Sequence, residues 1–233
     1  MKGIKGKKAD WTYENHLGRL EGLAIGGADE CGRGAWSGNL VVGAAVYHAK
    51  AEVNFRLGDS KKYTAGGRER LVELFTKEYI DKGLLHVAYA DIDATTIENG
   101  NLNDLNLHGF TRAFEELRRI AHFDKVIIDG DIRCGDDDFP WLDEGANCIG
   151  TRVMTLVKGD ERSITIATAS IFAKVRHDHQ MMELDKQYPQ YGFASHVGYG
   201  TEAHKAAILK HGPIPGVHRS NFLRNLRREG LLK

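Results

Sequence analysis

Four acidic residues stand close to short apolar runs, where a strand would bring them to an edge of a sheet: Asp29, Glu30, Asp129 and Asp160. Carboxylates gathered with few cations among them are the ligands that hard divalent ions prefer. Two such ions, about 3.5–4 Å apart, stabilise the entering and leaving oxygens when a phosphodiester is hydrolysed. An acidic pair after a strand is by itself more often a solvated loop, so the surrounding stretches decide between the two interpretations.

The glycine-rich turn after the first acidic pair is the second candidate site. Asp29 and Glu30 can serve one centre only if the strand ends or bends between them, because side chains alternate between the faces of a strand. The following Gly32, Arg33 and Gly34 make such a bend cheap, since glycine tolerates positive φ. The turn also exposes backbone N–H and C=O groups to a ligand, and Arg33 adds a positive charge.

Apolar runs and capping signals predict an α/β chain with an antiparallel start, in which the second strand pairs with the first. Strands are expected at 23–28, 40–47, 84–89, 125–128 and 149–157. Helices are expected from an N-cap at Thr64 to a stop at Gly83, in the second half of 97–121, at 164–187, and at 201–211.

Composition excludes several functional classes. The chain has 233 residues, 42% of them hydrophobic, and a formal net charge of zero, which argues against strong, indiscriminate nucleic-acid binding. The three cysteines, Cys31, Cys134 and Cys148, form no Cys-x-x-Cys motif, which disfavours a zinc site and indicates a reducing compartment, hence the cytosol. No apolar run approaches the roughly 20 residues of a membrane span, and the N-terminal lysines precede no signal-peptide core.

The chain resembles the ribonuclease HII family in four stretches that follow the family's order and span about 23–222. They are Ile25–Gly34, Val126–Gly130, Val157–Asp160 running into Ala169–Val175, and His196–Thr201. The glycine turn, and the lack of an added N-terminal domain, favour this family over the related ribonuclease HIII. The resemblance implies a ribonuclease H-like fold, a mixed five-stranded sheet flanked by helices. It also implies a catalytic domain at 21–187 and a small C-terminal helical extension at 188–233 that contributes to substrate binding. The lysines before them predict a basic N-terminal arm at 1–20, for which a plain solvated terminus is the alternative.

Residue by residue, the resemblance implies two groups of site residues. The catalytic carboxylates, which bind Mg²⁺ or Mn²⁺, are Asp29, Glu30, Asp129 and Asp160. The substrate-binding residues are Gly32, Arg33, Gly34, Lys61, Lys62 and Tyr199. In the family the glycine turn reads the ribonucleotide, the Asp59-Ser60-Lys61-Lys62 element lies beside the substrate backbone, and the tyrosine stacks on the deoxyribose after the junction.

The implied activity is an endonuclease that cuts the RNA strand of RNA–DNA hybrids. It cuts 5′ to a ribonucleotide at an RNA–DNA junction or embedded in duplex DNA. The partners are those nucleic acids, no sliding-clamp motif is evident, and nothing requires more than a monomer. Alternatives are a binding module that has lost catalysis, which the four retained acids disfavour, and another nuclease or strand-transferase on the same fold, which the glycine and tyrosine elements disfavour.

Other charged residues have plainer interpretations. Asp178 is interpreted as a structural ion-pair partner and Asp131 as a loop residue. The run Asp136–Asp138 is interpreted as a solvated loop, because like charges packed together repel. The arginines near the C-terminus, Arg224, Arg227 and Arg228, are interpreted as solvated.

Overall fold

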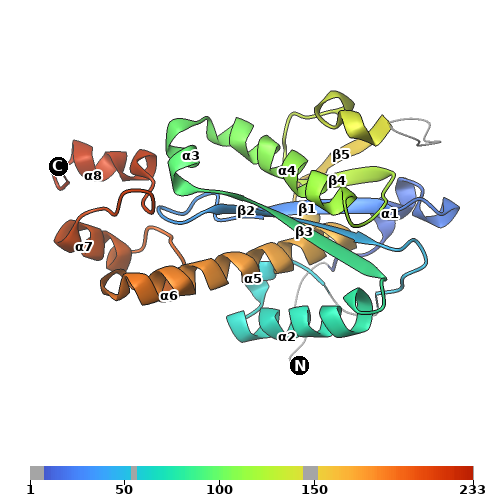
Figure 1. The fold of residues 1–233 in the computed structure, drawn as a ribbon, viewed down its shortest axis with the longest axis horizontal. Coiled ribbons are helices and arrows are strands. Elements are labelled where there is room, and N and C mark those ends of the chain that lie inside the picture. Colours follow the sequence, from blue (N-terminus) through green and yellow to red (C-terminus); the bar gives the residue numbers. More distant parts are fainter. Residues whose placement is uncertain (1–7, 54–56, 144–151, 233) are drawn as a thin grey trace. The chain divides into compact units, whose positions relative to one another are not determined.

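The computed structural model describes residues 8–53, 57–143 and 152–232. Five strands form one sheet in the order β3-β2-β1-β4-β5 (Figure 1). They are β1 (Ile25–Cys31), β2 (Leu40–Tyr47), β3 (Leu85–Ile92), β4 (Lys125–Asp129) and β5 (Val153–Leu156). The helices are α1 (Thr12–His16), α2 (Ala65–Phe75), α3 (Ala94–Asn99), α4 (Leu102–Arg118), α5 (Ile164–Gln187), α6 (Phe193–His196), α7 (Glu202–His211) and α8 (Arg224–Arg228).

The chain divides into two compact units. Unit 1 comprises the chain up to Glu30, Val42–Ala90 and Leu107–Val175, and unit 2 comprises Cys31–Val41, Asp91–Asn106 and the chain from Arg176. The predicted α/β class is confirmed, and β2 and α5 have the predicted bounds. β5 is shorter than the predicted strand at 149–157, of which residues 149–151 lie outside the described residues.

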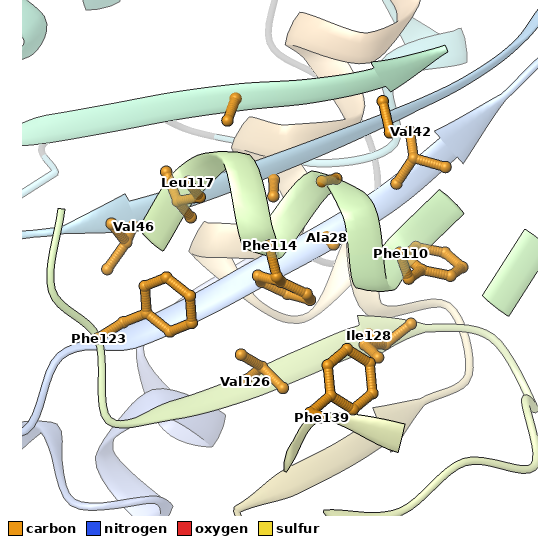
Figure 2. Packing of buried hydrophobic residues seen from close by; sticks show 14 of the residues in the cluster. Ala28, Val42, Val46, Phe110, Phe114, Leu117, Phe123, Val126, Ile128 and Phe139 are labelled. Atoms are coloured by element: carbon orange, nitrogen blue, oxygen red, sulfur yellow. The ribbon is translucent and has the colours of Figure 1, made fainter. Parts of the chain in front are cut away.

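Strand β2 separates two halves of the core of unit 1. Val42 and Val46 lie on the face covered by α4, against Phe110 and Phe114 (Figure 2). The alternate residue Ala45 faces the other side, where α2 and α5 pack. This alternation is the period of two expected of a strand covered on both faces. In Figure 2, β2 runs opposite to β4, as its labelled residues show, so the predicted antiparallel start is present.

Glycines let the long helix α5 approach the sheet closely. A Cβ atom on Gly27 of β1 would lie 2.4 Å from Thr165 Oγ1 and 2.6 Å from the backbone nitrogen of Ile166. A Cβ atom on Gly43 of β2 would lie 2.7 Å from the carbonyl oxygen of Ala169. Only hydrogen fits at these positions, and this contact fixes the beginning of α5 against the central strands.

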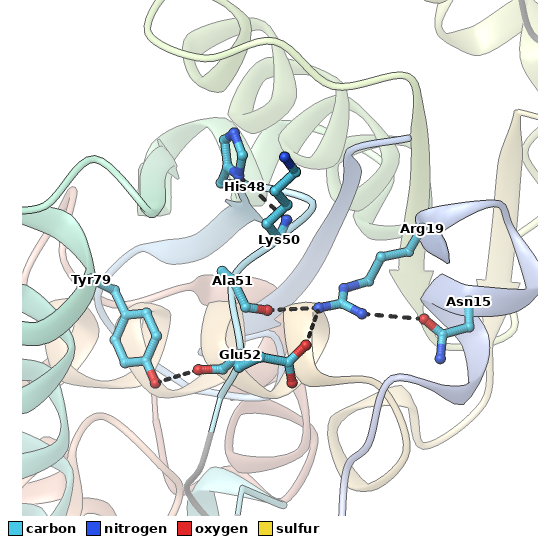
Figure 3. A network of polar contacts seen from close by, with 7 residues as sticks. All are labelled: Asn15, Arg19, His48, Lys50, Ala51, Glu52 and Tyr79. Carbon is cyan, nitrogen blue, oxygen red and sulfur yellow. Dashed lines mark hydrogen bonds and ion pairs between the residues drawn. The ribbon is translucent and has the colours of Figure 1, made fainter. Parts of the chain in front are cut away.

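The first described residues are bound to unit 1 by polar contacts. The Arg19 guanidinium is buried, donates to the Ala51 carbonyl at 2.6 Å and pairs with Glu52 at 3.4 Å (Figure 3). The Tyr79 hydroxyl donates to the Glu52 carbonyl at 2.9 Å, which ties the same segment to the helical turn Thr76–Ile80 that follows α2.

Glu14 of α1 caps helix α5 from a distant part of the sequence. Its fully buried Oε1 accepts hydrogen bonds from Ser163 Oγ at 2.7 Å and from the Thr165 backbone N–H at 3.0 Å and hydroxyl at 2.9 Å. Burial raises the pKa of Glu14, against these hydrogen bonds, which lower it. A side chain from α1 therefore satisfies a donor in the first turn of α5.

The sequence-based division at 20/21 and 187/188 stays a prediction. Of the basic residues in the predicted arm, Lys2, Lys5 and Lys7 lie outside the described residues, and Lys8 is exposed. Unit 2 has its own apolar cluster around Met181, Tyr191, Phe193, Ile208, Leu223 and Leu226. Among the described helices, none combines the length and the apolar character needed to cross a membrane.

Candidate active site

Parallel strands bring acidic residues to one edge of the sheet in unit 1. β1 pairs with β4 as far as Ala28 opposite Ile128, and β4 pairs with β5 through its last residue, Asp129. One residue beyond the last of these residue pairs, Ala28 and Ile128, Asp29 lies beside Asp129. The turn after β5 then carries Asp160. The carboxyl ends of β1, β4 and β5 thus supply the predicted acids at the same edge.

Asp29 and Glu30 are both still part of β1, which runs on to Cys31 rather than ending between them. The Asp29 side chain is 7% exposed, and its Oδ1 accepts the Glu30 backbone N–H at 2.8 Å. Glu30 is half-buried. Its charge is nevertheless close enough to raise the pKa of Asp29, so the two acids act on one neighbourhood although the strand does not end between them.

The turn that carries Asp160 is built around Asp129. The backbone N–H of Gly159 donates to Asp129 Oδ1 at 2.5 Å. Lys158 adopts a left-handed conformation with φ of 56°, which is uncommon for a non-glycine residue. A Cβ atom on Gly159 would lie 2.5 Å from Ile166 Cδ1 and 3.1 Å from Asp129 Oδ1. A side chain at 159 would therefore displace Ile166 and press on Asp129, whereas glycine leaves both in place.

Burial raises the pKa values of three of these acids, and the charges of neighbouring acids raise those of Asp29 and Asp160 further. Burial, then the charges of Glu30, Asp129 and Asp160, raise the pKa of Asp29 well above its ordinary value. Burial raises the pKa of Asp129, although the Gly159 N–H lowers it. Burial, followed by the charge of Asp129, raises the pKa of Asp160 to about 6. Each raised pKa means that the ionised carboxylate is less favourable here than in water. A bound cation would stabilise the ionised form.

The donor set fits a hard divalent ion, because all four side chains offer carboxylate oxygens. Within residues 8–53, 57–143 and 152–232, no three His, Cys, Asp or Glu side chains are arranged so that they could hold a metal ion. The acids therefore share a neighbourhood without their oxygens meeting at one point. Since like charges repel, drawing those oxygens together requires a cation between them.

The two lysines predicted to contact substrate differ in their surroundings. Lys62 Nζ forms an ion pair with Glu161 Oε1 at 2.5 Å. Lys61 forms no ion pair within 4 Å with any described residue, and its charge lowers the pKa of both Asp129 and Asp160. Lys61 is thus the cation that faces the acids in unit 1, whereas Lys62 is engaged by a neighbouring carboxylate.

Ser170 is a member of this site that the sequence did not indicate as functional. Its buried hydroxyl lies 3.0 Å from Ser60 Oγ, and it hydrogen-bonds the Asp29 carboxylate, which lowers the pKa of Asp29. A serine facing the sheet from within the small and apolar residues of α5 is the only sequence signal that could have suggested this role. It connects Asp29 to the segment that carries Lys61.

In unit 2, the turn Gly32–Gly34 turns its carbonyl groups toward a buried arginine. Arg219 is fully buried, and its Nη1 donates to the carbonyl oxygens of Gly32 at 2.7 Å and Ala35 at 3.0 Å. Gly32 has φ of 84°, and a Cβ atom there would lie 2.7 Å from the His177 ring, so glycine is required. The Arg33 guanidinium donates to Asn103 Oδ1 at 2.5 Å.

Tyr199 lies against the same turn within unit 2. A Cβ atom built on Gly34 would be 3.9 Å from Tyr199 Cε1, and a Cβ atom on Gly200 would be 2.1 Å from the Trp36 ring. Burial, then the Cys31 thiol, raise the pKa of Tyr199 to about 12, against a lowering by the Gly32 N–H. The structure thus brings the predicted glycine turn and the predicted tyrosine together.

Two hydrogen-bonded histidines support the backbone of Tyr199, and nothing in the sequence indicated this role. His218 Nδ1 accepts the Ile214 N–H at 2.8 Å, so its Nε2–H donates to His204 Nε2 at 3.2 Å. His204 Nδ1–H then donates to the Tyr199 carbonyl at 3.0 Å. Burial is the largest cause that lowers the pKa of His204 and of His218 to about 4, which keeps both rings neutral at pH 7.

The acids given plainer interpretations have structural surroundings. Asp131 is exposed. Asp136, interpreted as part of a solvated loop, instead caps β5: its Oδ1 accepts the Val153 N–H at 3.1 Å. That aspartate is only half-exposed, because the first residues of β5 need an acceptor there. Asp178 Oδ1 lies 3.6 Å from His177 Nδ1, in line with the predicted ion-pair role.

Comparison with known proteins gives a consistent picture. A family model described as Ribonuclease HII matches residues 26–225. The chain is similar to a protein named Ribonuclease HII from Geobacter metallireducens, with 37% identity over 217 residues that cover 93% of this chain and 92% of the relative. It is also similar to a protein of the same name from Clostridioides difficile, with 36% identity over 204 residues that cover 88% and 71% of the two chains.

Solved structures match the fold. The crystal structure of ribonuclease H2 from Pyrococcus horikoshii OT3 superimposes with a TM-score of 0.68 and 25% identity, covering 89% of this chain and 98% of that one. The structure of Bst-RNase HIII in complex with Mn²⁺ gives a TM-score of 0.68 at 20% identity, covering 100% and 77%. These matches confirm the predicted ribonuclease H-like arrangement of a five-stranded sheet flanked by helices.

Proposed function

The chain belongs to the ribonuclease HII family, and on that premise we propose that it is an endonuclease hydrolysing the RNA strand of RNA–DNA hybrids. The observation that carries this proposal is the set of acids at the carboxyl ends of β1, β4 and β5, where three pKa values are raised together. Buried carboxylates that repel one another are retained where a cation is to be bound.

We propose Asp29, Glu30, Asp129 and Asp160 as the groups that hold the metal. Two divalent ions, Mg²⁺ or Mn²⁺, would supply positive charge at the entering and leaving oxygens when bound. The Gly159 N–H holds Asp129 in place, and Ser170 does the same for Asp29. Asp160, with a pKa of about 6, is ionised at neutral pH and ready to ligate.

Substrate contacts in unit 1 are proposed for the two lysines. Lys61 is the better supported, because it forms no ion pair among the described residues and its charge already acts on the acids. A lysine ammonium in this place suits a phosphate oxygen of the cut strand. For Lys62 to bind phosphate, its ion pair with Glu161 would have to open.

The finer part of the proposal is recognition of the junction. The enzyme would cut 5′ to a ribonucleotide embedded in duplex DNA and leave 5′-phosphate and 3′-hydroxyl ends. The backbone N–H groups of Arg33 and Gly34 donate to no described residue, so they are available to a substrate oxygen. A 2′-hydroxyl, which accepts as well as donates, distinguishes RNA from DNA. Tyr199, facing the same turn, would stack on the following deoxyribose. The monomeric state and cytosolic location predicted from the sequence are part of this proposal.

The test is cleavage of a DNA duplex that contains one ribonucleotide, with and without Mg²⁺. Wild-type protein should cut it once, on the 5′ side of the ribonucleotide, only when the metal is present. The Asp29→Asn variant should keep its circular dichroism spectrum and lose cleavage, because one oxygen ligand and its charge are removed. Full activity of that variant would refute the ligand assignment, and an uncut substrate with wild type would refute the proposed function.

A further inference from the structure

The glycine turn of unit 2 is held from the inside by one side chain. Arg219 donates from Nε to the Gly38 carbonyl at 2.9 Å, and from Nη1 to the carbonyls of Gly32 at 2.7 Å, Ala35 at 3.0 Å and Arg33 at 3.3 Å. Four carbonyl groups from seven consecutive residues therefore converge on a single guanidinium.

The backbone of Arg219 is anchored to the same segment. Its N–H donates to the Trp36 carbonyl at 2.8 Å, and the preceding His218 forms an antiparallel bridge with Ser37. The backbone of Arg219 cannot move away without breaking these bonds. Arg219 is thus fixed at both ends, by its main chain and by its side chain.

This guanidinium lacks the partner that usually makes burial of an arginine tolerable. No carboxylate among the described residues lies within 4 Å of it, and its Nη2 donates to no described atom. Burial lowers the pKa of Arg219 to about 10, which leaves it charged at neutral pH. A buried charge without a carboxylate partner is costly. The hydrogen bonds to the carbonyl groups are therefore the contacts that offset this cost, and holding those carbonyls is the role of Arg219.

Peptide geometry links those carbonyls to the outer side of the turn. In a trans peptide the C=O of one residue and the N–H of the next point in opposite directions, and no cis peptide is present in the described chain. With the Gly32 and Arg33 carbonyls turned toward Arg219, the N–H groups of Arg33 and Gly34 point away from it. Neither donates to any described residue.

We propose that Arg219 is the positioning residue of the glycine turn: by holding its carbonyls inward, it presents the adjacent N–H groups of Arg33 and Gly34 as a donor pair for one acceptor oxygen of the ribonucleotide. Consecutive N–H groups of this kind form a small anion- and oxygen-binding concavity. The acceptor is a 2′-hydroxyl oxygen or the adjoining phosphate oxygen. The inference rests on the proposed function, and Arg219 itself touches no substrate.

Binding without catalysis tests this role. Two duplexes of one sequence, one all-DNA and one with a single ribonucleotide, are titrated in EDTA, with fluorescence anisotropy giving a Kd for each. Two hydrogen bonds, each contributing roughly fivefold, predict that Arg219→Lys binds the ribonucleotide duplex more than tenfold less tightly. Lysine keeps the charge but cannot reach carbonyls that are held by both Nε and Nη1. The control is Arg224→Lys, an exposed arginine bonded to Asn221, which should match wild type.

The two duplexes distinguish the acceptor. If Arg219→Lys loses affinity only for the ribonucleotide duplex, the acceptor of the N–H pair is the 2′-oxygen. If a variant with unchanged circular dichroism loses affinity equally for both duplexes, the acceptor is the phosphate oxygen. Wild-type Kd values for both duplexes in folded Arg219→Lys would overturn the inference. Failure of wild type to cut or prefer the ribonucleotide duplex would count against the proposed function instead.

A second measurement needs no variant and covers the case in which Arg219→Lys does not fold. In the ¹⁵N spectrum of wild-type protein, the Arg33 and Gly34 amide signals should shift downfield when the ribonucleotide duplex is added in EDTA. Those two signals should move more than the Gly135 amide, which is bonded to Asp138 in unit 1. Unmoved Arg33 and Gly34 signals under saturating duplex would also overturn the inference.

Discussion

Replacing Asp160 with asparagine should stabilise the metal-free protein while removing its function. Burial, with the charges of Asp129 and Asp59, raises the pKa of Asp160 from 3.8 to about 6. A shift of about two pH units corresponds to about 3 kcal/mol, at roughly 1.4 kcal/mol per unit. Because the side chain is only partly buried, screening reduces this to about 1 kcal/mol. The carboxylate accepts no hydrogen bond from the described residues, so the amide forfeits none.

The sign follows from proton linkage. A carboxyl whose pKa is raised by folding is protonated in both states well below pH 4. The penalty on the folded state builds up as the pH rises from about 4, where the unfolded chain ionises, to about 6, where the folded state ionises. Urea unfolding in EDTA should therefore give Asp160→Asn a free energy of unfolding about 1 kcal/mol above wild type at pH 7.5. The difference should vanish near pH 4. Asp131→Asn, which neutralises an exposed carboxylate in the neighbouring loop, should stay within about 0.5 kcal/mol of wild type.

Added Mg²⁺ should reverse the order. A ligand that binds only the folded state stabilises it by mass action, and wild type has the complete set of acids. In 10 mM Mg²⁺ the wild-type free energy of unfolding should rise by more than that of Asp160→Asn. If Asp160→Asn were less stable than wild type in EDTA at pH 7.5, or if Mg²⁺ stabilised both proteins equally, the assignment of Asp160 to a shared cation site would be wrong.

Two further predictions concern unit 2. Gly200→Ala should cost about 1–3 kcal/mol of stability, because its Cβ would lie 2.1 Å from the Trp36 ring, whereas Gly135→Ala, with open space around it, should cost far less in urea unfolding. Burial lowers the pKa of His204 and His218 to about 4, so the folded state resists protonation that the unfolded chain accepts near 6.5, and each ring should lower the stability by about 2 kcal/mol between pH 7 and 5. His204→Asn should show a smaller acid-dependent loss, and an unchanged loss would contradict the assignment.

The elements that the sequence predicted well are those whose signals are local. Strand β2 is a run of apolar residues bounded by polar ones, and helix α5 must stop before Pro189. The Thr64 N-cap is also a local signal, and its hydroxyl accepts the Gly67 N–H. In contrast, the sequence predicts a helix only in the second half of 97–121. The structure has two helices around this stretch, α3 and α4, because the Asp93 side chain caps the short helix α3.

The site divides in the same way. The acids could be named because each follows a strand or precedes a helix, and a recognisable order of motifs links them. Arg219 could not, because its contacts depend on four carbonyl groups converging from a segment about 180 residues away in sequence. Nor could the ion pair that engages Lys62, since Glu161 reaches it across a separation of 99 residues. Neither composition nor motif spacing indicates such contacts between residues that are far apart in the sequence.

The capping of α5 by Glu14 makes α1 part of the framework that supports the proposed active site. That carboxyl group closes the first turn of the helix, which begins four residues after Asp160, so shortening the chain beyond residue 14 would leave the helix start without its acceptor. A protein shortened to begin at β1 would lack this helix cap, although it would retain all four proposed metal ligands. The start site chosen for recombinant work should therefore lie upstream of α1.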